Sequence, residues 1–258
     1  MREFTNLGWP QTPYAAGMRP FAKKVRLLTG MSIQWADEGT GAVPIGAAAV
    51  FIPVHRTASR DITAETFHFG YRTVAMDPDS HRTDIPAFVD GILVQGRREA
   101  EIIGWHSFPD DLHALHSLLS TPHAGIDAVG AAWANRAERE RSTALLVDTA
   151  RDTMRLDSAI KAGGLDFGPV LWQYRAPDVL QHVYEDLTAP GVLAEDLVWH
   201  TQHIGAAALM SALAVALLAG QEAERLSWAE PFDVAQALRL AAWDTMPLAF
   251  DTTPLRGN

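Results

Sequence analysis

An uncharged, alanine-rich run from Ile204 to Gly220 constrains the fold of this chain more than any other stretch. A segment that is apolar on every side must be buried, either in a protein core or in a bilayer. The run is shorter than the roughly 20 residues that a membrane-spanning helix needs, and two histidines, His200 and His203, lie just before it. It therefore predicts a buried core helix that begins near Leu197, and no association with a membrane.

The composition sets further limits. The chain has 258 residues, of which 48% are apolar, so it can bury a sizeable core as one large domain, with or without a C-terminal extension. Because it contains no cysteine, disulfides, thiolate catalysis and cysteine-based zinc sites are excluded. A formal net charge of -10 argues against a broad basic surface for duplex DNA, but it is compatible with a narrow acidic pocket that holds metal ions and receives one nucleic-acid end. The N-terminal residues MREFTNLGWPQTPY lack an apolar signal core, which predicts a cytoplasmic protein.

Three strands are predicted in the first third of the chain, at residues 26–35, 45–53 and 66–74. The third alternates aromatic and small or polar residues, as a half-buried strand does. Because the strands follow one another without a helical pattern between them, we expect an antiparallel meander. Residues 1–24, which are rich in glycine, proline and aromatic side chains, are predicted to form an irregular arm over the body.

Helical and strand patterns alternate after the meander. The predicted order is a helix at residues 85–95, a strand at 102–105, a helix directly after it, a strand at 144–147, and helices at 154–162, at 176–187 and from 197 onward. This order predicts a mixed α/β sheet flanked by helices. We divide the chain into the arm at 1–24, an α/β domain at 25–220, and a C-terminal helix and tail at 221–258.

The junction between the predicted strand at 102–105 and its helix carries a cluster of polar residues. Trp105 and Ser107 are followed by Asp110 and Asp111, which fall in the predicted first helical turn. Negative charge is stabilised there by unpaired N–H groups and the helix dipole, and two adjacent acids at the mouth of a sheet suit a divalent cation. Alternatively, Asp110 only caps the helix and binds no cation, and the sequence leaves both interpretations equally open.

This junction resembles a motif of the DnaQ-like 3′–5′ exonuclease family, whose fold is RNase H-like. In WHSFPDDL, His106, Ser107 and Asp111 follow the family's G-H-N-x-x-F-D-L, so the resemblance implies that Asp111 is a metal ligand. The segment ADEGTG resembles the family's first motif, D-x-E-T-T-G, in part. Glu38 matches its glutamate, whereas alanine stands in place of its aspartate, and Asp37 would face the opposite side of a regular strand.

The third motif of the family, H-x-x-x-x-D, is matched only by His200, since Gly205 stands where the final aspartate is expected. Altogether the resemblance implies an RNase H-like mixed sheet, with a three-strand meander plus parallel strands. It further implies two Mg²⁺ or Mn²⁺ ions about 3.5–4 Å apart that act on the 3′ end of a single-stranded nucleic acid or on a nucleotide. Glu38 and Asp111 would be ligands, Asp37, Asp110 or Asp196 would be recruited in place of the missing acids, and His200 would be the general base.

Two alternatives to a working exonuclease stay open. In one, the scaffold has lost its chemistry and serves as a binding or structural subunit, with its two ends docking a protein partner or a second copy of the chain. In the other, the chain is a metal-dependent hydrolase of a different type, in which His113 and His116 act with Asp110 or His106. His113 and His116 also suit a solvated helix face, because the chain has no H-E-x-x-H sequence.

Overall fold

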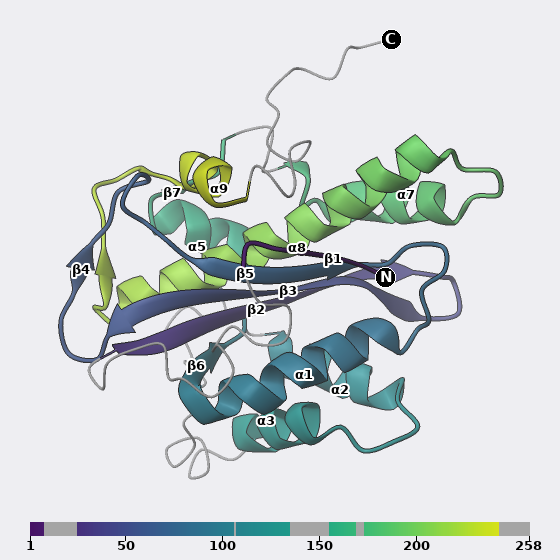
Figure 1. The fold of residues 1–258 in the computed structure, drawn as a ribbon, viewed down its shortest axis with the longest axis horizontal. Helices are drawn as coiled ribbons and strands as arrows, with labels where there is room; N and C mark the ends of the chain where they lie inside the picture. Colours follow the sequence, from purple (N-terminus) through teal and green to yellow (C-terminus); the bar gives the residue numbers. More distant parts are fainter. Residues whose placement is uncertain (8–24, 106, 135–154, 169–172, 243–258) are drawn as a thin grey trace.

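The computed structural model describes residues 1–7, 25–105, 107–134, 155–168 and 173–242. These residues form three layers, in which one sheet lies between two layers of helices (Figure 1). The predicted mixed α/β class is therefore confirmed. The predicted strand at 144–147 and most of the N-terminal arm lie outside the described residues.

The central sheet has five strands in the order β1-β5-β3-β2-β6. Their bounds are β1 (Arg2–Thr5), β2 (Val25–Asp37), β3 (Ala42–His55), β5 (Gly70–Ala75) and β6 (Ala100–Ile103). The neighbours from β1 to β2 are antiparallel, and β6 is parallel to β2. The predicted meander is confirmed as β2, β3 and β5. Its third strand begins later than predicted because the hydroxyls of Thr63 and Thr66 bond within a turn there.

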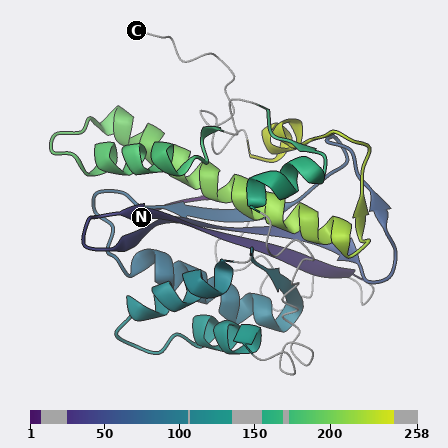
Figure 2. The same cartoon turned by 180° about the vertical axis from the view of Figure 1, so that it is seen from behind.

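Helices cover both faces of the sheet, as the view from behind also shows (Figure 2). One face packs against α1 (Asp84–Glu99), α2 (Phe108–Ser117) and α3 (Ala124–Ala134). The other packs against α5 (Leu156–Ala162), α7 (Pro177–Thr188), α8 (Ala194–Glu222) and α9 (Val234–Ala242). Two short pairs complete the fold, β4 (Arg60–Asp61) with β8 (Leu226–Ser227) and β7 (Leu165–Asp166) with β9 (Phe232–Asp233).

The predicted core helix is α8, which packs across β2, β3 and β5. By length and composition α8 could cross a membrane, but its apolar window is completely buried inside the protein, as in the core helix of a soluble protein. It approaches the sheet closely at Gly30, where an added Cβ would collide with the backbone carbonyl of Ala212. The hydroxyl of Thr73 lies 3.0 Å from the carbonyl oxygen of Gly205 and ties the sheet to the helix.

The two ends of the described chain belong to this same body. The prediction of an irregular arm is wrong for residues 2–5, because they pair with β5 as the edge strand β1. Beyond α8, Phe232, Val234 and Leu238 are buried in the core that α8 also fills. The C-terminal helix predicted at 221–258 is present as α9, and it packs on this core.

Candidate functional site at the end of β6

A cavity of about 310 Å³ lies beside β2, where its parallel neighbour β6 ends. The last residue of β6, Ile103, pairs with Gly30, so β2 continues past it. Polar residues from four elements line the cavity: Ser32 and Gln34 of β2, Asp111 of α2, Asp157 of α5, and Ser211 of α8. Segments far apart in the sequence therefore meet at one point between the two helical layers.

Asp111 enters the cavity from the first turn of α2, as the sequence predicted for this acid. Its Oδ1 accepts a 2.9 Å hydrogen bond from Nε1 of Trp35. Burial raises the pKa of the Asp111 carboxyl to about 7, the hydrogen bond from Trp35 opposes the rise, and the charge of Asp110 adds to it. The N-cap of α2 is Ser107, so Asp110 is not the cap. Near neutral pH Asp111 is a mixture of acid and carboxylate.

Arg175 is a cation of the cavity that the sequence analysis did not identify. Its side chain is only 9% exposed, although it precedes α7 in an irregular segment. Nε donates to Oγ of Ser211 at 2.9 Å, and a terminal nitrogen lies 3.3 Å from Oδ1 of Asp157. Burial lowers the pKa of Arg175 and Asp157 opposes this, yet a guanidinium stays charged in proteins. The cavity therefore contains a fixed positive charge.

The two polar residues of β2 bond to each other. Nε2 of Gln34 donates to Oγ of Ser32 at 2.9 Å. Residues two apart on a strand point to the same face, which Ser32 and Gln34 share with Leu28 and Gly30. This pattern, two polar side chains at alternate positions of a buried strand, is the sequence signal that could have identified them.

Asp37 is the last residue of β2 and Glu38 begins the turn after it, and neither lines the cavity among the described residues. Glu38 forms an ion pair with Arg82 and accepts a 2.7 Å hydrogen bond from the hydroxyl of Tyr184. Burial and the Glu38 carboxylate raise the pKa of Tyr184 to about 12, so this hydroxyl remains a donor. Oδ1 of Asp37 accepts a hydrogen bond from the backbone N–H of Gly39 at 2.7 Å. Both acids thus have structural partners in and around the turn.

His200 lies in α8, where its side chain is 8% exposed and its Nε2 is 3.8 Å from Oδ2 of Asp186. It is not among the described residues that line the cavity. One turn further, His203 donates from Nε2 to the backbone carbonyl of Tyr174 at 3.1 Å, since a carbonyl only accepts. Burial lowers the pKa of His203 to about 4. This neutral histidine thereby anchors the segment that carries Arg175.

The structure does not join Glu38, Asp111 and His200 by any contact within the described ranges. His113 and His116 are exposed on α2, and Nδ1 of His116 lies 2.8 Å from Oδ1 of Asp127. His106 lies outside the described residues. Within the described part of the chain, no group of three histidine, aspartate or glutamate side chains could hold a metal ion.

The donors of the cavity itself suit a divalent cation poorly. Mg²⁺ needs about six oxygen ligands in a regular arrangement. The cavity offers Asp111, whose raised pKa keeps it partly protonated near pH 7, and Asp157, which already faces a guanidinium. Its other polar side chains include the cations Arg155 and Arg175 and the neutral groups of Ser32, Gln34, Ser107 and Ser211. These side chains therefore do not supply the set of oxygen ligands that a Mg²⁺ ion needs.

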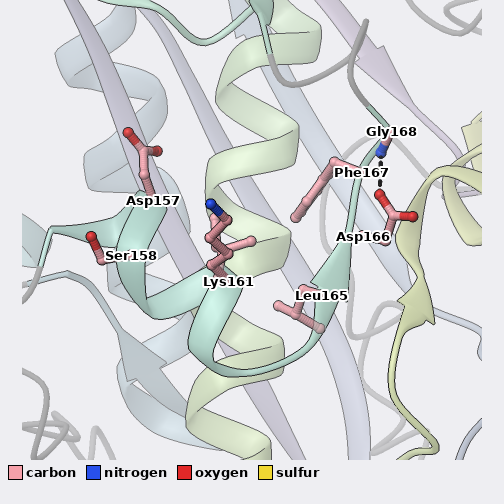
Figure 3. Close-up of a pocket in the computed structure, with 8 residues that line it drawn as sticks. Asp157, Ser158, Lys161, Leu165, Asp166, Phe167 and Gly168 are labelled. Carbon is pink, nitrogen blue, oxygen red and sulfur yellow. Dashed lines mark hydrogen bonds between the residues drawn. The ribbon is translucent and has the colours of Figure 1, made fainter.

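A second cavity, of about 490 Å³, lies on the other side of the first turn of α5 (Figure 3). Asp157, Ser158 and Lys161 of α5 form one side, and Leu165 and Phe167 lie opposite (Figure 3). Its polar side chains are exposed, and Asp166 is engaged by the backbone N–H of Gly168 at 2.7 Å. It has no buried charged group comparable to Arg175, which makes the first cavity the stronger candidate.

Comparison of the chain with protein-family models, with curated proteins and with solved structures found no match. The functional assignment therefore depends on the geometry of the cavity and on the sequence resemblance.

Proposed function

We propose that this chain binds a nucleotide or the 3′ end of a single-stranded nucleic acid on an RNase H-like scaffold, without hydrolysing it. The observation that carries the proposal is the buried Arg175 guanidinium in the same cavity as Asp111. A site that binds phosphate through a fixed cation has no need of metal ions for affinity. The proposal thus favours the binding-subunit hypothesis over the working exonuclease.

The order of elements supports the scaffold. The meander β2, β3 and β5 is followed by α1 and then by β6, which runs parallel to β2. This is the layout that the exonuclease resemblance implies for the first part of an RNase H-like domain. The cavity lies where β6 passes into α2, at the segment that resembles the family's middle motif.

The cavity residues of β2 support the loss of hydrolysis. Ser32 and Gln34 have the one-residue spacing of the acids in D-x-E, and they lie on the strand that leads into the cavity. Both are neutral, so they add no charge to hold a cation. The assignments of Glu38, Asp37 and His200, and of Mg²⁺ or Mn²⁺, stay predictions that apply only to an active enzyme.

The remaining lining is suited to a nucleotide. Trp105 contributes an aromatic ring to the wall, and aromatic rings stack on bases. Hydroxyl and amide groups of Ser32 and Gln34 can bond to sugar or base edges. The volume is at the lower end of the roughly 300–1,000 Å³ typical of small-ligand sites. The cavity therefore fits one nucleotide unit better than a long strand.

The test is binding and turnover of fluorescein-labelled DNA and RNA single strands. We expect a rise in fluorescence anisotropy in EDTA, and strands of unchanged length after incubation with Mg²⁺ or Mn²⁺. Shortening of the strand that Asp111→Ala abolishes would instead establish the exonuclease. Absence of binding to any strand or nucleotide would refute the proposal and leave the structural-subunit alternative. Calorimetric titration with Mn²⁺ separates these outcomes further, because only an active metal site gives a binding isotherm.

Docking of a protein partner or a second copy through the chain ends stays a prediction. The same holds for the cytoplasmic location.

A further inference from the structure

Resting on the proposed function, we infer that the cavity recognises a terminal phosphate monoester, which Arg175 binds directly. The inference concerns the chemical class of the ligand: an inorganic phosphate, a nucleoside monophosphate and a phosphorylated strand end share the same group. A strand that ends in a hydroxyl lacks it.

The position of Arg175 is the first support. A guanidinium presents N–H donors in a planar fork that matches two oxygens of a phosphate. Its side chain is 9% exposed, so a phosphate that reaches it enters a medium where charge pairing is stronger than in water. Its Nε bond to Ser211 fixes the orientation of the fork.

An incoming phosphate can displace the Asp157 carboxylate from its ion pair with Arg175. The closest approach is 3.3 Å, and the Asp157 side chain is 50% exposed. Because half of the Asp157 side chain is exposed, its carboxylate can turn toward solvent when a phosphate takes its place beside Arg175. Asp157 then excludes weaker anions by competing with them for Arg175.

The charges around Arg175 favour one anionic group and not a polyanion. Arg155 lies exposed at the rim, and Asp157 and Asp111 are the acids of the lining. Because the pKa of Asp111 is raised to about 7, this acid repels an anion less than an ordinary carboxylate does. The chain as a whole carries a net charge of -10, which opposes the approach of a long nucleic acid.

Two hydroxyls add neutral donors. Ser107 lines the cavity at the N-cap of α2, and its side chain makes no capping hydrogen bond. Oγ of Ser211 accepts from Arg175, so its own O–H can donate to a ligand. Hydroxyl groups of this kind can donate hydrogen bonds to the oxygens of a bound phosphate.

The experiment compares paired ligands by competition in EDTA against a labelled 3′-phosphorylated strand. The competitors are the same strand with a 3′-hydroxyl, a nucleoside 3′-monophosphate, a nucleoside 5′-monophosphate, the nucleoside and inorganic phosphate. We expect the phosphorylated member of each pair to bind roughly tenfold or more tightly, because charge-assisted bonds to a buried guanidinium are strong. The ranking of free phosphate, nucleotides and strand ends then identifies the source of the group.

Arg175→Gln should abolish the difference between the paired ligands, and Arg175→Lys should retain part of it. Arg82→Gln is the matched control, since it also removes one positive charge but lies in the exposed pair with Glu38. Equal binding of phosphorylated and hydroxyl-ended strands by wild-type protein would overturn the inference while the proposed function survives. Absence of all binding would overturn both. If an Arg175 variant does not fold, the comparison of phosphorylated and hydroxyl-ended strands on wild-type protein still tests the inference.

Discussion

The indole Nε1 of Trp35 donates a 2.9 Å hydrogen bond to Oδ1 of Asp111. The bond connects β2 to the first turn of α2, two elements whose residues also line the cavity. Trp35 is partly buried among the apolar side chains under α1, α2 and α3. Asp111 is thus a buried acid whose hydrogen-bond donor is neutral, and its protonation should affect the stability of the protein.

Asp111 should make the protein less stable as pH rises. Its pKa is about 7 in the folded protein and near 4 when unfolded, so folding favours the protonated form. The stabilising contribution is complete below the unfolded pKa and is lost as pH rises through about 7. Asp111→Asn keeps the acceptor for Trp35 and removes the titration, so the loss, of roughly 4 kcal/mol at most, should disappear.

Urea denaturation of wild type and Asp111→Asn between pH 4 and pH 8 measures this loss. Asp79→Asn is the control, because Asp79 is an exposed acid that is not among the groups that shift the pKa of Asp111. Parallel stability curves for wild type and Asp111→Asn would contradict the prediction.

His203 should make the protein less stable as pH falls, whereas Asp111 should do so as pH rises. Its pKa falls to about 4 in the folded protein, so the neutral form is favoured by folding. The protein should lose stability as pH drops below the unfolded value of about 6.5 and on toward 4, by roughly 3 kcal/mol. His203→Gln can still donate to the Tyr174 carbonyl and does not titrate, so its stability curve should lack this loss. His113→Gln, on the exposed face of α2, should follow the wild-type curve.

Gly30→Ala should destabilise the fold by about 1–3 kcal/mol. An added Cβ would collide with the carbonyl of Ala212 and lie 2.8 Å from Cβ of Ala216, so α8 would have to move off β2. Gly91→Ala is the matched control. Gly91 lies in α1 with no atom within 4 Å of its added Cβ, and alanine there should stabilise the helix by up to about 1 kcal/mol. Thermal unfolding of both variants provides the comparison, and equal shifts would contradict the close contact of α8.

Glu38→Gln should leave ligand binding within about twofold of wild type, because Glu38 bonds to Arg82 and Tyr184 outside the cavity. Its stability should fall by about 1 kcal/mol or less, since the ion pair is exposed. Competition binding with the phosphorylated strand measures the first effect. A large loss of affinity for the phosphorylated strand would show that Glu38 belongs to the binding site, and it would favour the metal-based hypothesis.

Local patterns predicted most of the elements. The apolar runs of β2 and β3, and the leucine spacing of α2, are local patterns that each segment carries in itself. The burial of α8 also followed from its sequence, because a helix without a polar face has nowhere else to go. The start of β5 was missed because the hydroxyls of Thr63 and Thr66 form a turn that strand propensity does not report.

The candidate site was predicted only where it coincides with a local motif. Asp111 was identified because the strand-to-helix junction has a recognisable composition. Ser32 and Gln34 were overlooked because their alternate spacing in β2 becomes a signal for a polar cavity only when the burial of that strand is known. The acids that the sequence brought forward at residues 37 and 38 have partners of their own in and around the turn after β2.

The sequence by itself determined most of the longer strands and helices and that α8 must be central, since these follow from periodicity and apolar content. Only the tertiary structure decided that Arg175, Asp157 and Ser211 meet Asp111 beside β2. The reason is that such a meeting depends on strand register, on the end of β6 at Ile103 and on the path of α8 over Gly30. These are properties of how elements pack, and no single segment encodes them.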